Sequence, residues 1–319
     1  PPPPPPPPPT DPPTPEIYTL THSSAASDVY KRQELIDPRL MPHARDRERL
    51  EAELSDRLAG VDEDDLEAQM EALRIFQRAA VFSTAVADLS GVLAVMKVSD
   101  RLSDIAEVIL GACTALARAQ MEVKHGRPRC GEPGALRDAG FAVIGYGKLG
   151  GIELGYGSDL DLVFVHDSEG TVQETAGTAS LECAVFFARM TRRLVHLLST
   201  QTASGALYEV DTRLRPSGKG GLMVSNLKGF EDYQRTEAWT WEHQALLRAR
   251  AVAGDPAVRA AFETLRVRIL TTCVDLQSLR ERVADMRDRM REELSRGTAS
   301  DFDLKQDRGG ITDIEFLVQ

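Results

Sequence analysis

The sequence has 319 residues, 42% hydrophobic and 27% charged, which is ordinary globular composition for about two domains. Its 38 basic and 49 acidic residues give a net charge of −11, which disfavours a protein that works on nucleic-acid phosphates. The sequence contains neither an apolar run long enough to span a membrane nor a signal-peptide pattern, so we expect no membrane partner. Four scattered cysteines without a Cys-x-x-Cys pair argue against a zinc site or a disulfide framework, and they fit a reducing, cytoplasmic location.

The first 33 residues are expected to carry no function. They begin with nine prolines and continue without hydrophobic periodicity, which favours an extended or disordered chain. Residues 23–33 resemble translated adapter sequence. We therefore interpret residues 1–33 as a disordered tail, either non-native or a natural flexible segment.

Residues 34–125 are predicted to form a helical region that leads into the rest of the chain. The acidic run at 62–65 predicts a helix start, because the helix macrodipole stabilises negative charge at an N-terminus. Apolar residues recur at helical spacing from Ile105 to Ala119. Glycine and proline crowd residues 125–140, which predicts a loop and a domain boundary.

Residues 140–225 are predicted to form a small mixed sheet with one helix, over 174–199. The predicted strands cover residues 141–144, 160–165, 207–214 and 222–224. From 226 to 319 the chain is predicted to be helical again, with a long amphipathic helix between Leu279 and Leu294. An apolar pattern at 314–318 resembles a helix that has been cut short, so we expect a truncated helical domain. Helices, a mixed sheet and further helices make an α+β layout.

A glycine turn, Gly145-x-Gly147-x-x-Gly150, follows the first predicted strand. On its own it matches the dinucleotide-binding fingerprint. Only about eight residues separate the turn from the aspartates of the next strand, too few for the crossover helix of that fold. The interpretation we favour joins the turn to those aspartates, Asp159 and Asp161.

Alternate residues of a strand share a face, so the carboxylates of Asp159 and Asp161 point the same way. They repel each other unless a cation lies between them, and Mg²⁺ bridging substrate phosphates suits such ligands. The turn at Gly147 would present backbone N–H groups to a triphosphate, with Lys148 and Ser158 as additional donors. The alternative is a solvated strand edge followed by a turn.

The predicted strand 207–214 alternates apolar residues with acids and then bases. If it lies beside the Asp159 strand, Asp211 completes a cluster of three carboxylates, and two metals would clamp an in-line displacement at phosphorus. Asp211 would also accept or orient the proton of an attacking hydroxyl. Arg213 and Arg215 would neutralise phosphate charge. The alternative is a half-exposed strand with local ion pairs.

Two tryptophans, Trp239 and Trp241, are two residues apart and do not share a helix face. We therefore interpret them as core or interface packing rather than as a platform for adenine. The polar side of the 174–199 helix is interpreted as a solvated face, and Glu242 and His243 as polar groups of a helix surface or of packing.

Four motifs carry a resemblance that covers about residues 34–319. They are Gly145-Tyr146-Gly147-Lys148-Leu149-Gly150-Gly151-x-Glu153-Leu154 with Ser158-Asp159-Leu160-Asp161-Leu162; Asp211-Thr212-Arg213-Leu214-Arg215-Pro216-Ser217-Gly218; Glu237-Ala238-Trp239-Thr240-Trp241-Glu242-His243-Gln244-Ala245; and Gly309-Gly310-Ile311-Thr312-Asp313-Ile314-Glu315-Phe316. Together they resemble the bifunctional glutamine synthetase adenylyltransferase/adenylyl-removing enzymes. The residues of the last three motifs are similar to those of the C-terminal, adenylylating half of that family.

The resemblance implies a polymerase-beta-like nucleotidyltransferase core that uses Mg²⁺ and ATP, with Asp159, Asp161 and Asp211 as the metal-binding and catalytic acids. It implies AMP transfer to a tyrosine of glutamine synthetase, with the PII signal protein as a regulatory partner. It also implies that the removing half is absent from this sequence. Phosphorolytic removal of AMP, an RNA or small-molecule acceptor, and a regulatory module without turnover remain the alternatives.

The final motif leaves three charged residues without a derived role, namely Lys305, Asp313 and Glu315. A brace between the helical region and the sheet is our interpretation for them.

Overall fold

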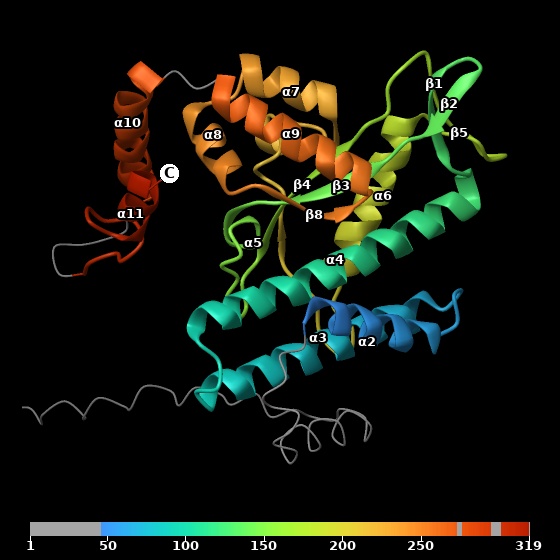
Figure 1. Cartoon of the computed structure of the whole chain (residues 1–319), viewed down its shortest axis with the longest axis horizontal. Helices are drawn as coiled ribbons and strands as arrows, with labels where there is room; N and C mark the ends of the chain where they lie inside the picture. The colour runs from blue at the N-terminus through green and yellow to red at the C-terminus, as the bar shows by residue number, and fades with distance from the viewer. Residues whose placement is uncertain (1–45, 273–275, 295–300, 319) are drawn as a thin grey trace, which may run out of the picture.

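The computed structural model describes residues 46–272, 276–294 and 301–318, and the predicted tail 1–33 lies outside the described residues (Figure 1). Three helices come first, as predicted: α2 (Arg47–Ala59), α3 (Leu66–Leu89) and α4 (Val95–His125). The acidic run does start a helix, because the Asp65 side chain caps α3 by accepting from the Ala68 N–H. Among the described residues, no helix is both long and apolar enough to cross a membrane.

The main sheet is mixed, as predicted, and has five strands. They are β3 (Phe141–Gly145), β4 (Leu160–His166), β6 (Val210–Asp211), β7 (Ser225–Asn226) and β8 (Arg250–Gly254). The order is β6-β4-β3-β8, with β7 also pairing with β4. β3 runs antiparallel to both β4 and β8, whereas β6 and β7 run parallel to β4. The sheet therefore gathers segments that are far apart in the sequence around the central pair β3 and β4.

Three details of the predicted sheet are wrong. The strand predicted at 207–214 shrinks to the two residues of β6, because the Asp211 carboxylate turns the chain by accepting from the Arg213 N–H at 2.8 Å. The last predicted strand forms at β7 rather than at 222–224. β8 interrupts a region predicted to be helical throughout, because its small alanine-rich sequence carries little strand signal until it pairs with β3.

A second, three-stranded sheet was missed. It has the order β2-β1-β5 and consists of β1 (Pro128–Glu132), β2 (Ala135–Asp138) and β5 (Val172–Thr175). The segment predicted as a loop thus holds a hairpin, whose turn contains Gly134 at a φ of +92°. β5 also takes up the start of the predicted 174–199 helix, so α6 begins only at Cys183 (Cys183–Ser199).

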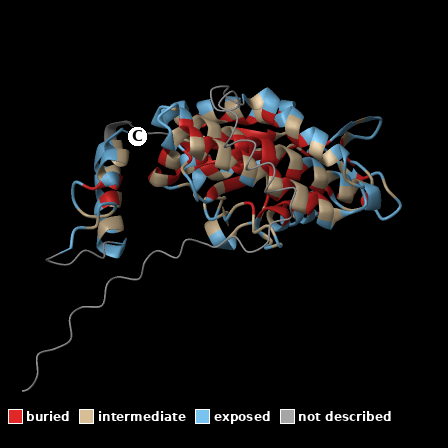
Figure 2. Ribbon diagram, turned by 90° about the horizontal axis from the view of Figure 1, so that it is seen from below, coloured by how far each residue is buried: buried red, intermediate tan, exposed pale blue. Residues whose placement is uncertain are grey.

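Apolar residues cover both faces of the main sheet. On one face, Phe141 and Leu162 pack with residues of α4 and α6. On the other face, Ile144 and Val163 pack with α7 (Leu227–Thr236), α8 (Thr240–Leu247) and α9 (Pro256–Thr272). Figure 2 shows the buried residues concentrated in this layered body. The central strands are thereby held rigidly from both sides.

The remaining helices are α5 (Gly147–Gly150), a single turn after β3, and two at the C-terminal end. α10 (Leu276–Leu294) matches the predicted amphipathic helix, and α11 (Ile311–Val318) covers the final apolar pattern. α10 contacts α8, and α11 packs along α10 (Figure 1).

Candidate active site

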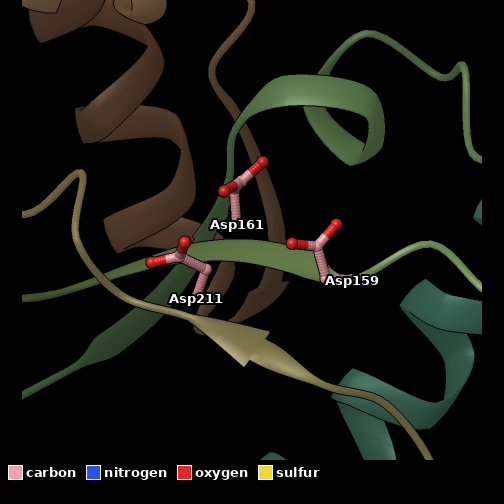
Figure 3. Close-up of side chains that lie close together, drawn as sticks. All are labelled: Asp159, Asp161 and Asp211. Atoms are coloured by element: carbon pink, nitrogen blue, oxygen red, sulfur yellow. The ribbon is translucent and has the colours of Figure 1, made fainter. Parts of the chain in front are cut away.

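The parallel pairing of β4 with β6 brings the predicted acids together. Leu160 is opposite Val210, and Asp161 is opposite Asp211. One carboxylate oxygen from each of Asp159, Asp161 and Asp211 lies within 4.8 Å of the others. Figure 3 shows the three side chains on the same side of the two neighbouring strands. The sequence predicted this cluster on the condition that the two strands lie side by side. The structure meets that condition, and the cluster forms.

Burial of the alternate residues fixes the direction of these carboxylates. Leu160, Leu162 and Phe164 are almost completely buried. Because side chains alternate along a strand, Asp159 and Asp161 must point to the opposite face. Turning the strand over would bury Asp159 and Asp161 in the apolar layer formed with α4 and α6, so the core determines where the acids point.

The glycine turn is shaped around Asp161. The Tyr146 N–H donates to the Asp161 carbonyl at 2.9 Å. Gly147 has a φ of +54°, and a Cβ there would collide with the Asp161 carboxylate. At Gly150 a Cβ would collide with the carbonyl oxygens of Arg248 and Gly145. Glycine is thus required at 147 by the close approach to Asp161 and at 150 by the close approach to the backbone of Arg248 and Gly145.

The dinucleotide interpretation of the same turn is excluded by topology. The helix after the turn, α5, has only four residues. β3 and β4 pair in the antiparallel sense, whereas a dinucleotide fold needs two parallel strands joined by a full crossover helix.

The cluster is electrostatically strained around Asp161. Burial raises the pKa of the Asp161 carboxyl, and the neighbouring charges of Asp159 and Asp211 raise it further, while Arg213 and Lys305 oppose the rise. The pKa of Asp211 is lowered, chiefly because the Arg213 side chain donates to its carboxylate. A hard divalent cation would relieve the repulsion, and three carboxylates offer the oxygen donors that Mg²⁺ prefers. The residues present therefore fit a magnesium site.

The other predicted site residues are placed as follows. Lys148 is exposed on α5, and the Ser158 hydroxyl accepts from the Gly155 N–H at 3.2 Å. Arg213 is paired with Asp211, its Nε lying 2.6 Å from a carboxylate oxygen. Arg215 directs its guanidinium into the turn that follows, where it donates to the carbonyls of Thr212, Lys219 and Gly221.

A cavity that sequence reasoning missed adjoins the cluster through Arg213. Its volume is about 510 Å³. It is lined by Arg213, Ser217, Gly218, Tyr233, Trp239, Trp241, Glu242, Met286, Arg289, Met290 and Glu293. Trp239 is 57% exposed at the start of α8, so it is not a core residue, and the other predicted role, packing at an interface, stays a prediction. Only the packing of α10 beside α8 creates this cavity, so spacing within one helix gave no signal of it.

Glu242 is buried and fixes the N-terminal end of α8. Its carboxylate accepts from the Trp239 N–H at 2.9 Å and from the Tyr233 hydroxyl at 2.8 Å. The prediction of a polar packing group is confirmed for this residue. The indoles and thioethers of the cavity suit stacking with a flat aromatic group.

A small mixed sheet that carries three clustered carboxylates beside a glycine turn, with helices on both faces, defines an α+β fold of the nucleotidyltransferase type. The comparisons with known proteins make this more specific. The model of the glutamate-ammonia ligase adenylyltransferase family matches residues 20–265, so the chain belongs to that family.

Curated relatives support the same assignment. The bifunctional glutamine synthetase adenylyltransferase/adenylyl-removing enzyme of Thioalkalivibrio sulfidiphilus is 54% identical over 286 residues, covering 90% of this chain and 30% of the relative. The proteins of that name from Pseudomonas putida and Hahella chejuensis are 51% and 53% identical, covering 89% and 85% of the chain. The chain spans about 30% of the length of these relatives.

Proposed function

We propose that this chain carries a nucleotidyltransferase centre that moves AMP from ATP to a tyrosine of glutamine synthetase. The observation that carries the proposal is the cluster of Asp159, Asp161 and Asp211 in a member of this family. The acceptor follows from the names of the relatives, which specify glutamine synthetase as the protein acted on. Net charge −11 speaks against an RNA acceptor.

In this proposal Asp159 and Asp161 hold Mg²⁺, and Asp211 shares in its coordination. The metal supplies positive charge that neutralises and orients the phosphates of ATP. The N–H groups of the turn at Gly147, with Lys148 and Ser158, line the path of the triphosphate. Arg213 is 69% exposed at its side chain, and it is free to exchange its partner Asp211 for a phosphate oxygen when nucleotide binds.

The reaction we propose is a direct in-line displacement. The tyrosine oxygen of the partner bonds to the α-phosphorus of ATP while the bond from that phosphorus to the bridging oxygen breaks, and pyrophosphate leaves. Asp211 orients the hydroxyl and takes its proton; the Arg213 side chain lowers the pKa of Asp211 and so favours the ionised carboxylate that an acceptor needs. No covalent enzyme intermediate is needed, because positioning and charge stabilisation lower the barrier.

Phosphorolytic removal, in which the AMP group moves to phosphate and forms ADP, is the alternative reaction, and the relatives' names include removal of the adenylyl group. We assign the adenylylating direction on the motifs at 211–218, 237–245 and 309–316, which are similar to that half of the family. By the same resemblance we expect regulation through the PII signal protein. A cytoplasmic location fits the three described cysteines, which are buried free thiols.

The test is transfer of α-labelled AMP from ATP to purified glutamine synthetase with Mg²⁺, comparing the chain with its Asp159→Asn/Asp161→Asn variant. We expect label on the synthetase with the unaltered chain and none with the variant. Transfer of the AMP group from modified synthetase to phosphate, seen as labelled ADP, without forward transfer, would reassign the chain to the removing reaction. Label that persists in the variant would exclude Asp159 and Asp161 from the mechanism.

A further inference from the structure

The cavity beside Trp239 is one part of a longer groove. A second cavity, of about 360 Å³, adjoins it between the start of α8 and the middle of α10. The two cavities share Trp239, Met286 and Arg289 in their linings. Arg213, on the side of the acid cluster, lines the first cavity, and Arg282 of α10 lines the second. This depression, called the α8–α10 groove below, therefore leads away from the acid cluster.

The residue types that line the groove are those of a protein-binding surface. Trp239 is 57% exposed, and Met286 and Met290, one turn apart on α10, are both half-buried. Tryptophan, tyrosine, methionine and arginine are enriched at protein–protein interfaces, and tryptophan, tyrosine and arginine dominate the binding energy there. Three arginines and four acids line the groove, so it offers no excess of positive charge that would favour a free phosphate.

Two of the lining residues are prepared for a partner. The backbone of Trp239 is fixed, because the buried Glu242 carboxylate accepts from its N–H at 2.9 Å. Within the part of the chain that the structure describes, Arg289 has neither a hydrogen bond nor an ion pair. An indole on a fixed backbone loses little conformational freedom on binding, and an unpaired guanidinium is free to donate to the oxygens of a partner.

Ion pairs hold the wall that α10 contributes. Arg287 of α10 donates to the Asp313 carboxylate at 2.6 Å, which joins α10 to α11. Arg248, at the end of α8, pairs with Glu315 of α11 at 3.3 Å. The brace predicted from the sequence therefore exists for Asp313 and Glu315, but it joins α11 to α10 and α8 rather than to the sheet. It keeps α10 beside α8, as the groove requires.

The groove opens on the side of the cluster that an acceptor must use. Arg213 lines the groove and donates to Asp211, the acid that orients the attacking hydroxyl in the proposed function. In an in-line displacement, the attacking oxygen and the leaving pyrophosphate lie on opposite sides of the phosphorus. The triphosphate belongs to the glycine turn and Ser158 in that proposal, and Ser158 lines a separate cavity of about 250 Å³. A nucleoside therefore has room apart from the groove.

We propose that the α8–α10 groove binds the polypeptide segment of the acceptor protein that carries the tyrosine. The tyrosine lies at the Arg213 end, and Trp239, Met286 and Arg289 contact the residues beside it in that segment. This inference rests on the proposed function. A protein segment fits the groove better than a nucleobase does, because the groove extends over two adjoining cavities and its charges nearly balance.

The test measures two affinities of the 319-residue chain: for immobilised, unmodified glutamine synthetase by biolayer interferometry, and for α,β-methylene-ATP with Mg²⁺ by calorimetry. Trp239→Ala should weaken binding to the synthetase by about tenfold or more, the size of an interface hot spot. Arg289→Gln should weaken it by about two- to fivefold, and this exposed, unpaired side chain leaves the fold intact.

Both variants should bind the ATP analogue normally, and in transfer assays both should raise the KM for the synthetase but not the KM for ATP. Trp239→Phe should restore most of the loss. Val267→Ala, which truncates an apolar side chain of α9 that is 53% exposed, is the matched control and should bind both ligands normally.

Weaker binding of the ATP analogue in both Trp239→Ala and Arg289→Gln would overturn the inference, because the groove would then hold the nucleotide. Unchanged binding of the synthetase in either variant would overturn it too, and AMP transfer by the unaltered chain would leave the proposed function standing. A chain that binds the synthetase through the groove but transfers no AMP would contradict the proposed function alone. If the unaltered chain does not bind the synthetase, this inference fails.

Discussion

The candidate site lies between two regions that are held together by different forces. On one side, β3 and β4 are buried between apolar layers, and Phe141, Leu162 and Ile144 are almost fully inaccessible. On the other side, the segment of α10 and α11 consists mainly of exposed and half-buried residues, as Figure 2 shows. The Arg248–Glu315 ion pair attaches it to the end of α8, and the Arg287–Asp313 pair joins α10 to α11. Hydrophobic packing fixes the acids, whereas ion pairs hold the C-terminal segment. Mutations and salt should therefore affect the two sides differently.

The largest expected effect is on the sheet side, at the centre of the cluster. Asp161→Asn should lower AMP transfer by at least about 10²–10³-fold, the cost of losing a main electrostatic contribution to the transition state. The variant should be no less stable than the unaltered chain, because it removes a carboxylate whose charged form is penalised by burial and by two like charges. Transfer assays and thermal melting check both parts. Asp138→Asn in the exposed hairpin is the control and should change neither.

A buried histidine at the end of β4 should make the sheet side sensitive to acid. Burial lowers the pKa of His166 from 6.5 to about 4, and its Nδ1 lies 2.8 Å from the Ser168 hydroxyl. The unfolded chain therefore binds the proton more readily, so the stabilisation is complete above pH 6.5 and is lost as the pH falls towards 4. The loss should reach roughly 2–3 kcal/mol. Denaturant unfolding across this range measures it, and His166→Gln should flatten the dependence.

The glycine turn offers a test of the contact between backbone and acid. Gly147→Ala should destabilise the chain by about 1–3 kcal/mol and also reduce transfer, because the new Cβ pushes on the Asp161 carboxylate. Gly91→Ala is the matched control, since Gly91 also has a positive φ, +69°, but open space around it. An equal loss of transfer in both variants would mean that the collision with Asp161 has no part in the effect.

The smallest effect is expected on the C-terminal side. Asp313→Asn keeps the shape of the side chain and removes the charge that pairs with Arg287, so it should raise amide hydrogen exchange in α10 and α11 by about two- to fivefold. High salt should raise the exchange of the same two helices in the unaltered chain. Asp288→Asn, in an exposed pair with Arg291, serves as the control. If Asp313→Asn lowered the melting temperature of the chain as much as Gly147→Ala, that result would contradict the division into two regions.

The sequence predicted those parts whose signal is local. Asp159 and Asp161 share a face because strands alternate, and Asp65 marks a helix start because acid stabilises that end. The hairpin of β1 and β2 was missed because its glycines and Pro128 suit a loop equally well. The cavity beside Trp239 depends on packing between distant segments, α8 and α10. Residue spacing within one element carries no information about such contacts.

The central claim is that the three carboxylates act together as a metal site for a nucleotide. The most direct test is the binding of Mn²⁺, as a spin-active substitute for Mg²⁺, measured by electron paramagnetic resonance in the presence of α,β-methylene-ATP. We expect the unaltered chain to bind Mn²⁺, and Asp161→Asn and Asp211→Asn each to weaken that binding by about tenfold or more, since each loses one charged ligand. Mn²⁺ binding that is equally tight in both variants would contradict the account.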